Sequence, residues 1–155
     1  ARLAAADLRA RFLIVGSGEL EAALRATVAS RGLSDRVRFL GWRKDVAMIY
    51  AASDVVAITS RNEGTPVALI ESMAAAVPGV SFAVGGVPDV ITAPDLGVLV
   101  TDGDIAALAG AIQRLFDDDG RRAEIGARAR RSVLERFGID RLACDLSTLY
   151  RQLVG

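Results

Sequence analysis

Two glutamates, Glu63 and Glu71, stand eight positions apart on either side of a Gly-Thr-Pro turn, Gly64 to Pro66. An apolar run precedes the turn and helical spacing follows it, so the first carboxylate is predicted in a loop and the second inside a helix. An ionised carboxylate only accepts hydrogen bonds, sugar hydroxyls donate them, and charge-assisted bonds are roughly twice as strong as neutral ones. The pair favours a site for a polyhydroxylated ligand, although either glutamate alone is also typical of a solvated surface carboxylate.

The same turn predicts a helix N-terminus that could hold an anion. Threonine is a good N-cap and proline is common at the first helical position, which puts Thr65 at the cap and Pro66 at N1. Exposed N–H groups and the positive end of the helix dipole favour a phosphate there. Many helices start this way with no ligand, so the turn supports a site only together with the two glutamates.

The composition excludes several other kinds of chemistry. The chain has 155 residues, no histidine and one cysteine, Cys144, which excludes Ser-His-Asp and Cys-His catalysis, histidine-bound zinc and an internal disulfide. Cys144 falls in a helical pattern and is expected to be a packing residue. The 19 basic residues balance 19 acidic ones, which argues against a nucleic-acid partner. No apolar run is long enough for a membrane span and no secretory signal is visible, so we expect a cytoplasmic protein.

Short apolar runs alternate with helical spacing along the chain. The runs predict strands that are apolar on both faces, as in a parallel sheet covered by helices on both sides: Phe12–Val15, Val37–Leu40, Asp54–Thr59, Val80–Ala83 and Gly97–Val100. Helices are predicted over Glu19–Arg31, Asp45–Ala52, Pro66–Val77, Val87–Ile91, Ile105–Asp117, Arg121–Phe137 and Ile139–Leu153. This alternation predicts an α/β fold with a Rossmann-like, doubly wound parallel sheet in a single domain over 1–155, whose part 101–155 is a helical tail packed on the sheet.

Loops at the carboxyl ends of such strands bind ligands and can share a cleft. Gly16 and Gly18 begin like a dinucleotide fingerprint, but Glu21 stands where the third glycine is needed, which argues against an NAD site. Trp42 could stack on a base or pack in a core, and the loop Gly85–Pro88 could offer glycines to a ligand or make a tight connection.

Several short motifs then occur in a fixed order: Phe12–Gly18, Val37–Gly41, Glu63–Pro66, Glu71–Ala75, Val77–Pro78, Ala83–Ile91 and Gly97–Val100. Together they resemble the retaining GT-B glycosyltransferases of the sucrose-synthase and bacterial mannosyl- and capsule-type kind. The resemblance implies the C-terminal half of a GT-B fold, which binds a nucleotide diphosphate sugar as donor of a hexosyl unit. It implies no metal and no cofactor beyond that donor, because helix N-termini and basic residues stabilise the leaving diphosphate.

The resemblance also implies a role for each residue of the site. Glu63 would bind hydroxyls of the donor sugar and act as the catalytic residue, and Glu71 would bind the ribose. The donor would further meet the turn and the loops after the first two strands: Gly64, Thr65, Pro66, Val67, Gly16, Gly18, Gly41, Arg43 and Lys44, of which the last three would line the base. Arg43, Lys44 and Arg61 could equally be solvated surface charges.

The chain departs from the family pattern at several places. Ala76 stands where glycine is usual, at a cost on the order of 1 kcal/mol, and Gly79 stands where a branched residue is usual. The family's first strand of this domain, with an arginine and a lysine for the diphosphate, is missing, and so is the N-terminal acceptor-binding domain. We therefore expect a fragment that is inactive without that partner domain, through which alone any peripheral membrane association would arise.

Other functions remain open at this level. One is a catalytically silent nucleotide-sugar-binding or interaction module, against which the retained Glu63 and Glu71 argue. Another is a sugar-nucleotide epimerase on the same fold, which would need other acid–base groups. A phosphoacceptor receiver domain lacks its acidic cluster after the first strand. The sequence does not name the base, the sugar or the acceptor.

Overall fold

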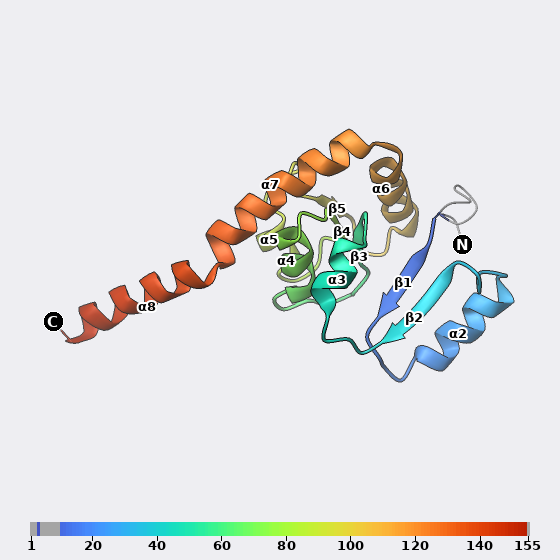
Figure 1. Cartoon of the computed structure of the whole chain (residues 1–155), viewed down its shortest axis with the longest axis horizontal. Helices are drawn as coiled ribbons and strands as arrows, with labels where there is room; N and C mark the ends of the chain where they lie inside the picture. The colour runs from blue at the N-terminus through green and yellow to red at the C-terminus, as the bar shows by residue number, and fades with distance from the viewer. Residues whose placement is uncertain (1–2, 4–9, 155) are drawn as a thin grey trace. The chain divides into compact units, whose positions relative to one another are not determined.

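The computed structural model describes residue 3 and residues 10–154, and it divides into two compact units, Ala1–Val46 and Ala47–Gly155. Every predicted strand and helix is present, with ends shifted by a few residues, which confirms the α/β fold with parallel strands and a helical C-terminal tail (Figure 1).

The strands are hydrogen-bonded in two groups, β1-β2 in the N-terminal unit and β3-β4-β5 in the C-terminal unit, and all pairings are parallel, as the sequence predicts. In the doubly wound order 3-2-1-4-5-6, the second strand pairs with the third, and the fourth to sixth are consecutive neighbours. Within each of the two groups the strands pair in chain order, as consecutive strands do on either side of that fold.

The N-terminal unit contains a parallel strand pair with its crossover helix. Strand β1 (Phe12–Val15) pairs with β2 (Val37–Gly41), and helix α2 (Glu21–Ser30) connects them. The register shifts between Ile14 and Val15, where the ladder is irregular. Within Glu21–Ser30, all of which the structure describes, no residue is buried. The unit is thus a β-α-β connection whose helix contributes little to a core.

The C-terminal unit is built on β3 (Val56–Ile58), β4 (Gly79–Phe82) and β5 (Val98–Val100), all parallel. Only β4 is buried along its whole length, whereas the middle residue of β3, Ala57, is exposed. The expectation that β3 is covered on both faces was therefore wrong. Helix α4 contacts β3 and β4, while α6 contacts β4 and β5, so the central strand packs against both helices.

Helices complete this unit, and their bounds are α3 Val46–Ala51, α4 Val67–Ala74, α5 Val87–Val90, α6 Ile105–Asp117, α7 Asp119–Phe137 and α8 Ile139–Val154. The core cluster combines side chains from α4 to α7 with those of β4 and the loop after it, among them Leu69, Met73, Val80 and Leu115. The core beneath the predicted site is thus formed by the helix that carries Glu71 and by the central strand.

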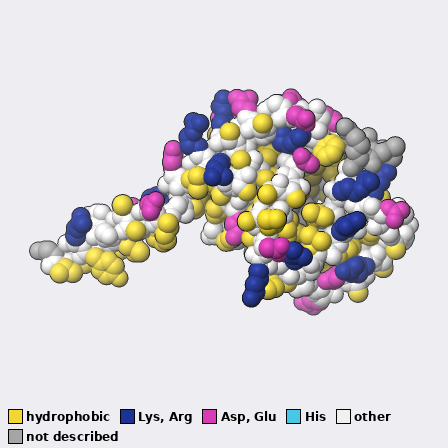
Figure 2. All heavy atoms as spheres, in the orientation of Figure 1, with side chains coloured by type: hydrophobic (Ala, Val, Ile, Leu, Met, Phe, Trp, Pro, Cys, Tyr) yellow, Lys and Arg dark blue, Asp and Glu magenta, His cyan; other side chains and the backbone are white. Residues whose placement is uncertain are grey.

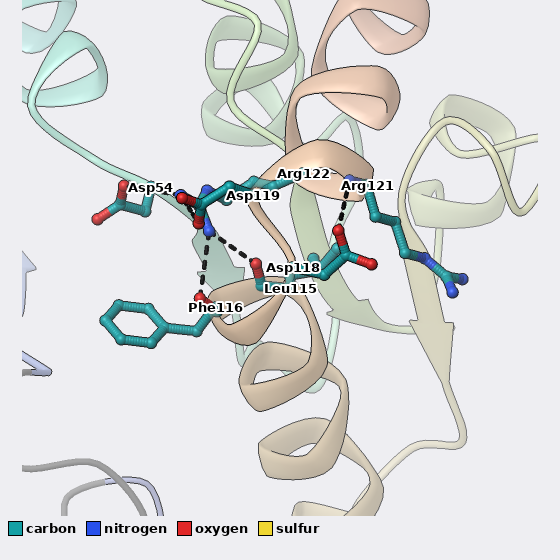
Figure 3. A network of polar contacts seen from close by, with 7 residues as sticks. All are labelled: Asp54, Leu115, Phe116, Asp118, Asp119, Arg121 and Arg122. Carbon is teal, nitrogen blue, oxygen red and sulfur yellow. Dashed lines mark hydrogen bonds and ion pairs between the residues drawn. The ribbon is translucent and has the colours of Figure 1, made fainter.

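A network of polar contacts around Arg122 links the end of α6 to the start of α7 (Figure 3). The Arg122 side chain on α7 donates to the carbonyl oxygens of Leu115 (2.8 Å) and Phe116 (3.3 Å), in the last turn of α6. It also forms ion pairs with Asp119 at 2.8 Å and with Asp54 at 3.6 Å. The last carbonyls of a helix have no partner within it, and a cation there is also favoured by the helix dipole.

Two further arginines of α7 bind the ends of other helices in the same way. Arg130 donates to the carbonyl oxygen of Ala74, the last residue of α4, at 2.7 Å. Arg136 donates to the carbonyl oxygens of Asp89 and of Val90, the latter at 3.0 Å, where α5 ends. Helix α7 is therefore fixed to the C-terminal ends of α4, α5 and α6.

Two predicted breaks separate the last three helices. The Asp118 side chain accepts from the Arg121 N–H at 2.8 Å and caps α7, and Gly138 adopts an extended conformation between α7 and α8. Helix α8 leaves the rest of its unit at this bend (Figure 1).

Of the tail that was predicted to pack on the sheet, α6 contacts β4 and β5 and α7 packs against α4 and α6. Helix α8 departs from that prediction, since none of its residues, all of which the structure describes, is buried. Exposed apolar side chains run along it, including Leu142, Leu146 and Leu149 (Figure 2). Cys144 is also exposed, so the expectation of a packing residue was wrong. The helical spacing alone could not reveal that this apolar stripe lacks a covering element. Across the described residues, none of the helices has the length and apolar character to cross a membrane.

The structure shows the surroundings of Ala76 and Gly79, the two residues that depart from the family pattern. Ala76 has φ +61°, so it holds the left-handed conformation that glycine adopts at a helix end. At Gly79, an added Cβ would overlap the Leu69 side chain, which is fully buried. The strain expected at Ala76 is present, whereas Gly79 makes room for a core leucine.

Candidate donor-binding site

The loop between β3 and α4 carries the first predicted carboxylate and is held from behind by the loop between β4 and α5. The N–H of Gly86 donates to the carbonyl oxygen of Glu63 at 2.9 Å. Gly85 has φ +50°, and a Cβ there would overlap the Glu63 carbonyl oxygen. A Cβ at Gly86 would overlap the carbonyl oxygen of Gly64. Two backbone segments thus lie in direct contact, and this contact fixes the position of Glu63.

This contact bears on one alternative that the sequence left open. Gly85 and Gly86 face the backbone of residues 63–64, so their lack of side chains serves the close approach of two loops. The close approach supports the tight-connection interpretation for these glycines. Their contribution to a binding site is indirect, through Glu63 and Gly64.

Helix α4 begins at Val67, with Pro66 as its N-cap. The prediction of Thr65 as N-cap was off by one residue: the Val67 N–H donates to the Thr65 carbonyl oxygen at 2.8 Å, and the Pro66 carbonyl accepts from the first turn of the helix. Such a boundary shift is ordinary for a helix end. Among the described residues, the N–H groups of Gly64, Thr65 and Ala68 make no hydrogen bond, so donors remain available at this helix N-terminus.

The surroundings of this N-terminus leave space for a ligand. A Cβ at Gly64 would meet no described atom within 4 Å, and Gly64, Thr65 and Val67 are exposed. Val67 is 57% exposed although it is apolar. Glu63 itself is half-buried.

Glu71 lies on the exposed side of α4 and has a partner that the sequence did not predict. The Tyr50 hydroxyl of α3 donates to Glu71 Oε2 at 3.0 Å. Burial, and then the hydrogen bond to Glu71, raise the pKa of Tyr50 to about 12, so the phenol keeps its proton at neutral pH. No spacing rule links positions 50 and 71, because they belong to different helices, and the structure is needed to bring them together.

The remaining predicted residues belong to the N-terminal unit. The Gly16 N–H donates to the Gly41 carbonyl oxygen at 2.8 Å, which brings the ends of β1 and β2 together. Gly16 and Gly41 have φ +116° and +65°, so both positions favour glycine. A Cβ at Gly16, Gly18 or Gly41 would meet nothing within 4 Å in the part of the chain that the structure describes. Backbone at the carboxyl ends of both strands is therefore accessible.

The basic residues of this loop are already engaged with neighbours. Arg43 donates from Nε to Asp45 Oδ1 at 2.7 Å and pairs with the second carboxylate oxygen as well. This hydrogen bonding raises the pKa of Arg43 and lowers the pKa of Asp45. Lys44 Nζ lies 5.6 Å from the ring centroid of Trp42, which is 68% exposed and so is not a core residue. Asp45 was not predicted, and it would compete with a phosphate for Arg43.

The structure thus brings Glu63, the turn and Glu71 onto one loop and helix, and it brings Gly16, Gly18 and Gly41 together in the other unit. Within the described ranges, no group of three or more Asp, Glu, Cys or His side chains could hold a metal ion. The first group presents two carboxylates and free backbone N–H groups, a combination that can bind both hydroxyls and phosphate oxygens.

Comparison with known families identifies the class of protein that carries this arrangement. Residues 1–118 match the family described as glycosyl transferases group 1, and the chain belongs to that family. A curated relative, the N-acetyl-alpha-D-glucosaminyl L-malate synthase of Bacillus anthracis, is 34% identical over 144 residues. The alignment covers 93% of this chain but 38% of that enzyme, so the chain spans well under half of its relative's length.

Solved structures agree with this assignment. Sucrose-phosphate synthase from Thermosynechococcus elongatus superposes with a TM-score of 0.82 at 32% identity, covering 91% of this chain and 38% of that one. The Anabaena protein HepE, in complex with UDP, gives a TM-score of 0.81 at 28% identity, covering 90% and 41%. The fold is therefore that of GT-B glycosyltransferases, as the sequence motifs predicted.

Proposed function

We propose that this chain is the donor-binding domain of a retaining glycosyltransferase, which moves a hexosyl unit from a nucleoside diphosphate to an acceptor. The observation that carries the proposal is the loop and helix of residues 63–71. Glu63 is fixed by the close backbone contact with Gly85 and Gly86, unbonded N–H groups follow it, and Glu71 extends from the same helix. The UDP complex of HepE supports a nucleotide sugar as the donor class.

In this proposal each group of the site has a distinct task. Glu71 accepts from the ribose hydroxyls, and the N–H groups of Gly64, Thr65 and Ala68 bind the diphosphate. Glu63 accepts from hydroxyls of the sugar and stabilises the positive charge that develops there as the diphosphate leaves. The helix N-terminus stabilises the departing anion, so the proposal includes no metal.

The first test measures nucleotide binding by the chain and by its Glu71→Gln variant, titrated with UDP into the millimolar range. Losing a charge-assisted hydrogen bond costs roughly 1.5–3 kcal/mol, so we expect an affinity lower by about ten- to a hundredfold. Glu135→Gln, an exposed glutamate on α7, is the matched control and should bind UDP as the unaltered chain does. Equal UDP affinity in a folded Glu71→Gln variant would refute the ribose role.

The second test distinguishes binding of the sugar from binding of the nucleotide. Glu63→Gln should keep UDP affinity within about twofold but weaken binding of the UDP-sugar, because the amide keeps the shape and loses the charge that accepts from two hydroxyls. In a protein that also contains an acceptor-binding part, the loss should fall mainly on kcat if Glu63 acts on the transition state. Full turnover by Glu63→Gln would reduce Glu63 to a solvated loop carboxylate.

The 155-residue chain should not transfer sugar by itself. It covers 38% of the curated relative's length, and the proposed acceptor site belongs to a further domain. Incubation with labelled UDP-sugars and candidate acceptors, assayed for product, tests this expectation. Robust transfer by the chain alone would overturn it, whereas nucleotide binding without turnover in a longer protein would favour the silent binding module.

A further inference from the structure

The contact between Tyr50 and Glu71 joins two helices whose sequences gave no reason to pair them. Tyr50 lies at the end of α3, and its own carbonyl accepts from the Ser53 N–H at 2.9 Å, which fixes the backbone at that point. Its hydroxyl reaches Glu71 Oε2 at 3.0 Å, a good hydrogen-bond length. Tyr50 is half-buried while Glu71 is exposed, so the tyrosine is the more restrained partner.

The chemistry of this pair leaves one side of the carboxylate available. A carboxylate has two oxygens and about four lone-pair positions, of which the tyrosine uses one on Oε2. No second partner of Glu71 is found among the described side chains. Oε1 and the remaining lone pairs can therefore accept from two neighbouring hydroxyls, as a ribose presents them.

We propose that Tyr50 is a positioning residue for the ribose site, which holds the Glu71 carboxylate in the orientation that accepts from both ribose hydroxyls. This inference rests on the proposed function of Glu71. A glutamate on the surface of a helix has several rotamers of similar energy, and fixing one of them beforehand removes part of the entropic cost of binding. The tyrosine contributes to affinity without touching the nucleotide.

The phenol suits this role because it stays protonated, and so remains a donor, at neutral pH. With its pKa raised to about 12, it does not ionise near neutral pH and so never repels the carboxylate. Phenylalanine at this position would keep the ring and its packing and remove only the donor.

The test compares UDP with 2′,3′-dideoxyuridine diphosphate, which lacks both hydroxyls, on four forms of the chain: unaltered, Tyr50→Phe, Glu71→Gln and the double variant. The unaltered chain should prefer UDP by about tenfold or more, and Tyr50→Phe should reduce that preference by roughly three- to tenfold. The double variant should show no loss beyond that of Glu71→Gln, because the tyrosine acts only through the glutamate. Affinity for the dideoxy compound should stay the same in the unaltered chain and Tyr50→Phe.

The chain offers a matched control, because its other tyrosine, Tyr150, lies exposed on α8. Tyr150→Phe should leave the preference unchanged. If Tyr50 were merely structural, Tyr50→Phe would lower the unfolding temperature and weaken both nucleotides equally, and that result overturns the inference. The inference is also overturned if Tyr50→Phe keeps the full preference for UDP and only Glu71→Gln loses it. That result would leave the proposed function of Glu71 intact. No binding of UDP, or no preference for it in the unaltered chain, removes the ribose role of Glu71 itself.

Discussion

The glycines after β4 and the glycines after β1 and β2 occupy equivalent places at the ends of parallel strands, yet they are glycine for different reasons. At Gly85 and Gly86 the space of a Cβ is occupied by the backbone of residues 63–64. At Gly16 and Gly41 the Cβ would meet open space, and only the positive φ angle favours glycine. Gly85 and Gly86 therefore help to fix the position of Glu63, because they contact its loop directly. Gly16 and Gly41 instead leave the backbone around them accessible.

Among substitutions of these glycines, the largest loss of stability is expected where another atom occupies the place of the added Cβ. Gly86→Ala would push a methyl group against the Gly64 carbonyl oxygen, and overpacking of this kind costs about 2–3 kcal/mol. Chemical denaturation should show that loss in the free energy of unfolding. UDP-sugar affinity should fall as well, since Glu63 moves with its loop. A variant as stable as the unaltered chain would mean that the two loops are not in tight contact in solution.

A smaller loss of stability is expected from substitution of Gly41, where only the backbone conformation disfavours a side chain. Gly41→Ala places a Cβ at φ +65° and should cost roughly 1–2 kcal/mol of stability. Because the space beside it is open, Gly41→Asn should recover part of the loss, since asparagine tolerates this conformation. If both variants lose equal stability, the requirement at this position is steric and the distinction between the two glycine groups fails.

The preference of glycine for positive φ angles predicts a gain of stability when Ala76 is replaced by glycine, because this alanine has φ +61°. Ala76→Gly should stabilise the chain by about 1 kcal/mol, which thermal or denaturant unfolding can measure. Ala75→Gly, one residue earlier at φ −82°, is the control and should destabilise. A loss of stability in Ala76→Gly would indicate that the alanine side chain makes a compensating contact.

The smallest effect on stability is expected at Gly64. This glycine has neither a positive φ nor an occupied Cβ position among the described residues, so Gly64→Ala should change the free energy of unfolding by less than about 0.5 kcal/mol. Its effect should appear in binding, because the methyl group would stand where the diphosphate approaches. Unchanged affinity for UDP in this variant would place the phosphate elsewhere.

Local patterns in the sequence predicted most of the fold because each element carries its own signal. The bounds of β1 and α6 are those predicted, and the breaks at Asp118 and Gly138 follow from a capping aspartate and a glycine. The division of the strands into two hydrogen-bonded groups was not predicted, since strand pairing depends on partners far away in the chain. The exposure of α8 was missed for a related reason: an apolar stripe shows that a helix face can be covered but not by what.

The arrangement of the candidate site could be predicted only where neighbours in sequence are neighbours in space. Glu63, the turn and Glu71 form one continuous segment, and their common location could be deduced from its length. Tyr50 and Asp45 were missed because each contacts a predicted residue, Glu71 or Arg43, through a side-chain hydrogen bond that spacing does not encode. The role of Gly85 and Gly86 was open for the same reason, since their neighbours come from a different loop.

The arginines of α7 also have a consequence for the order in which the chain folds. Arg130 and Arg136 bind carbonyls that lie 56 and 46 residues earlier in the sequence, and those acceptors exist in the right place only after α4 and α5 have formed and ended. Contacts that close such long loops form late, because the loop entropy is lost before the contact contributes. We therefore expect α7 to dock after α4 and α5 have formed, because Arg130 and Arg136 find their acceptors only where those helices end.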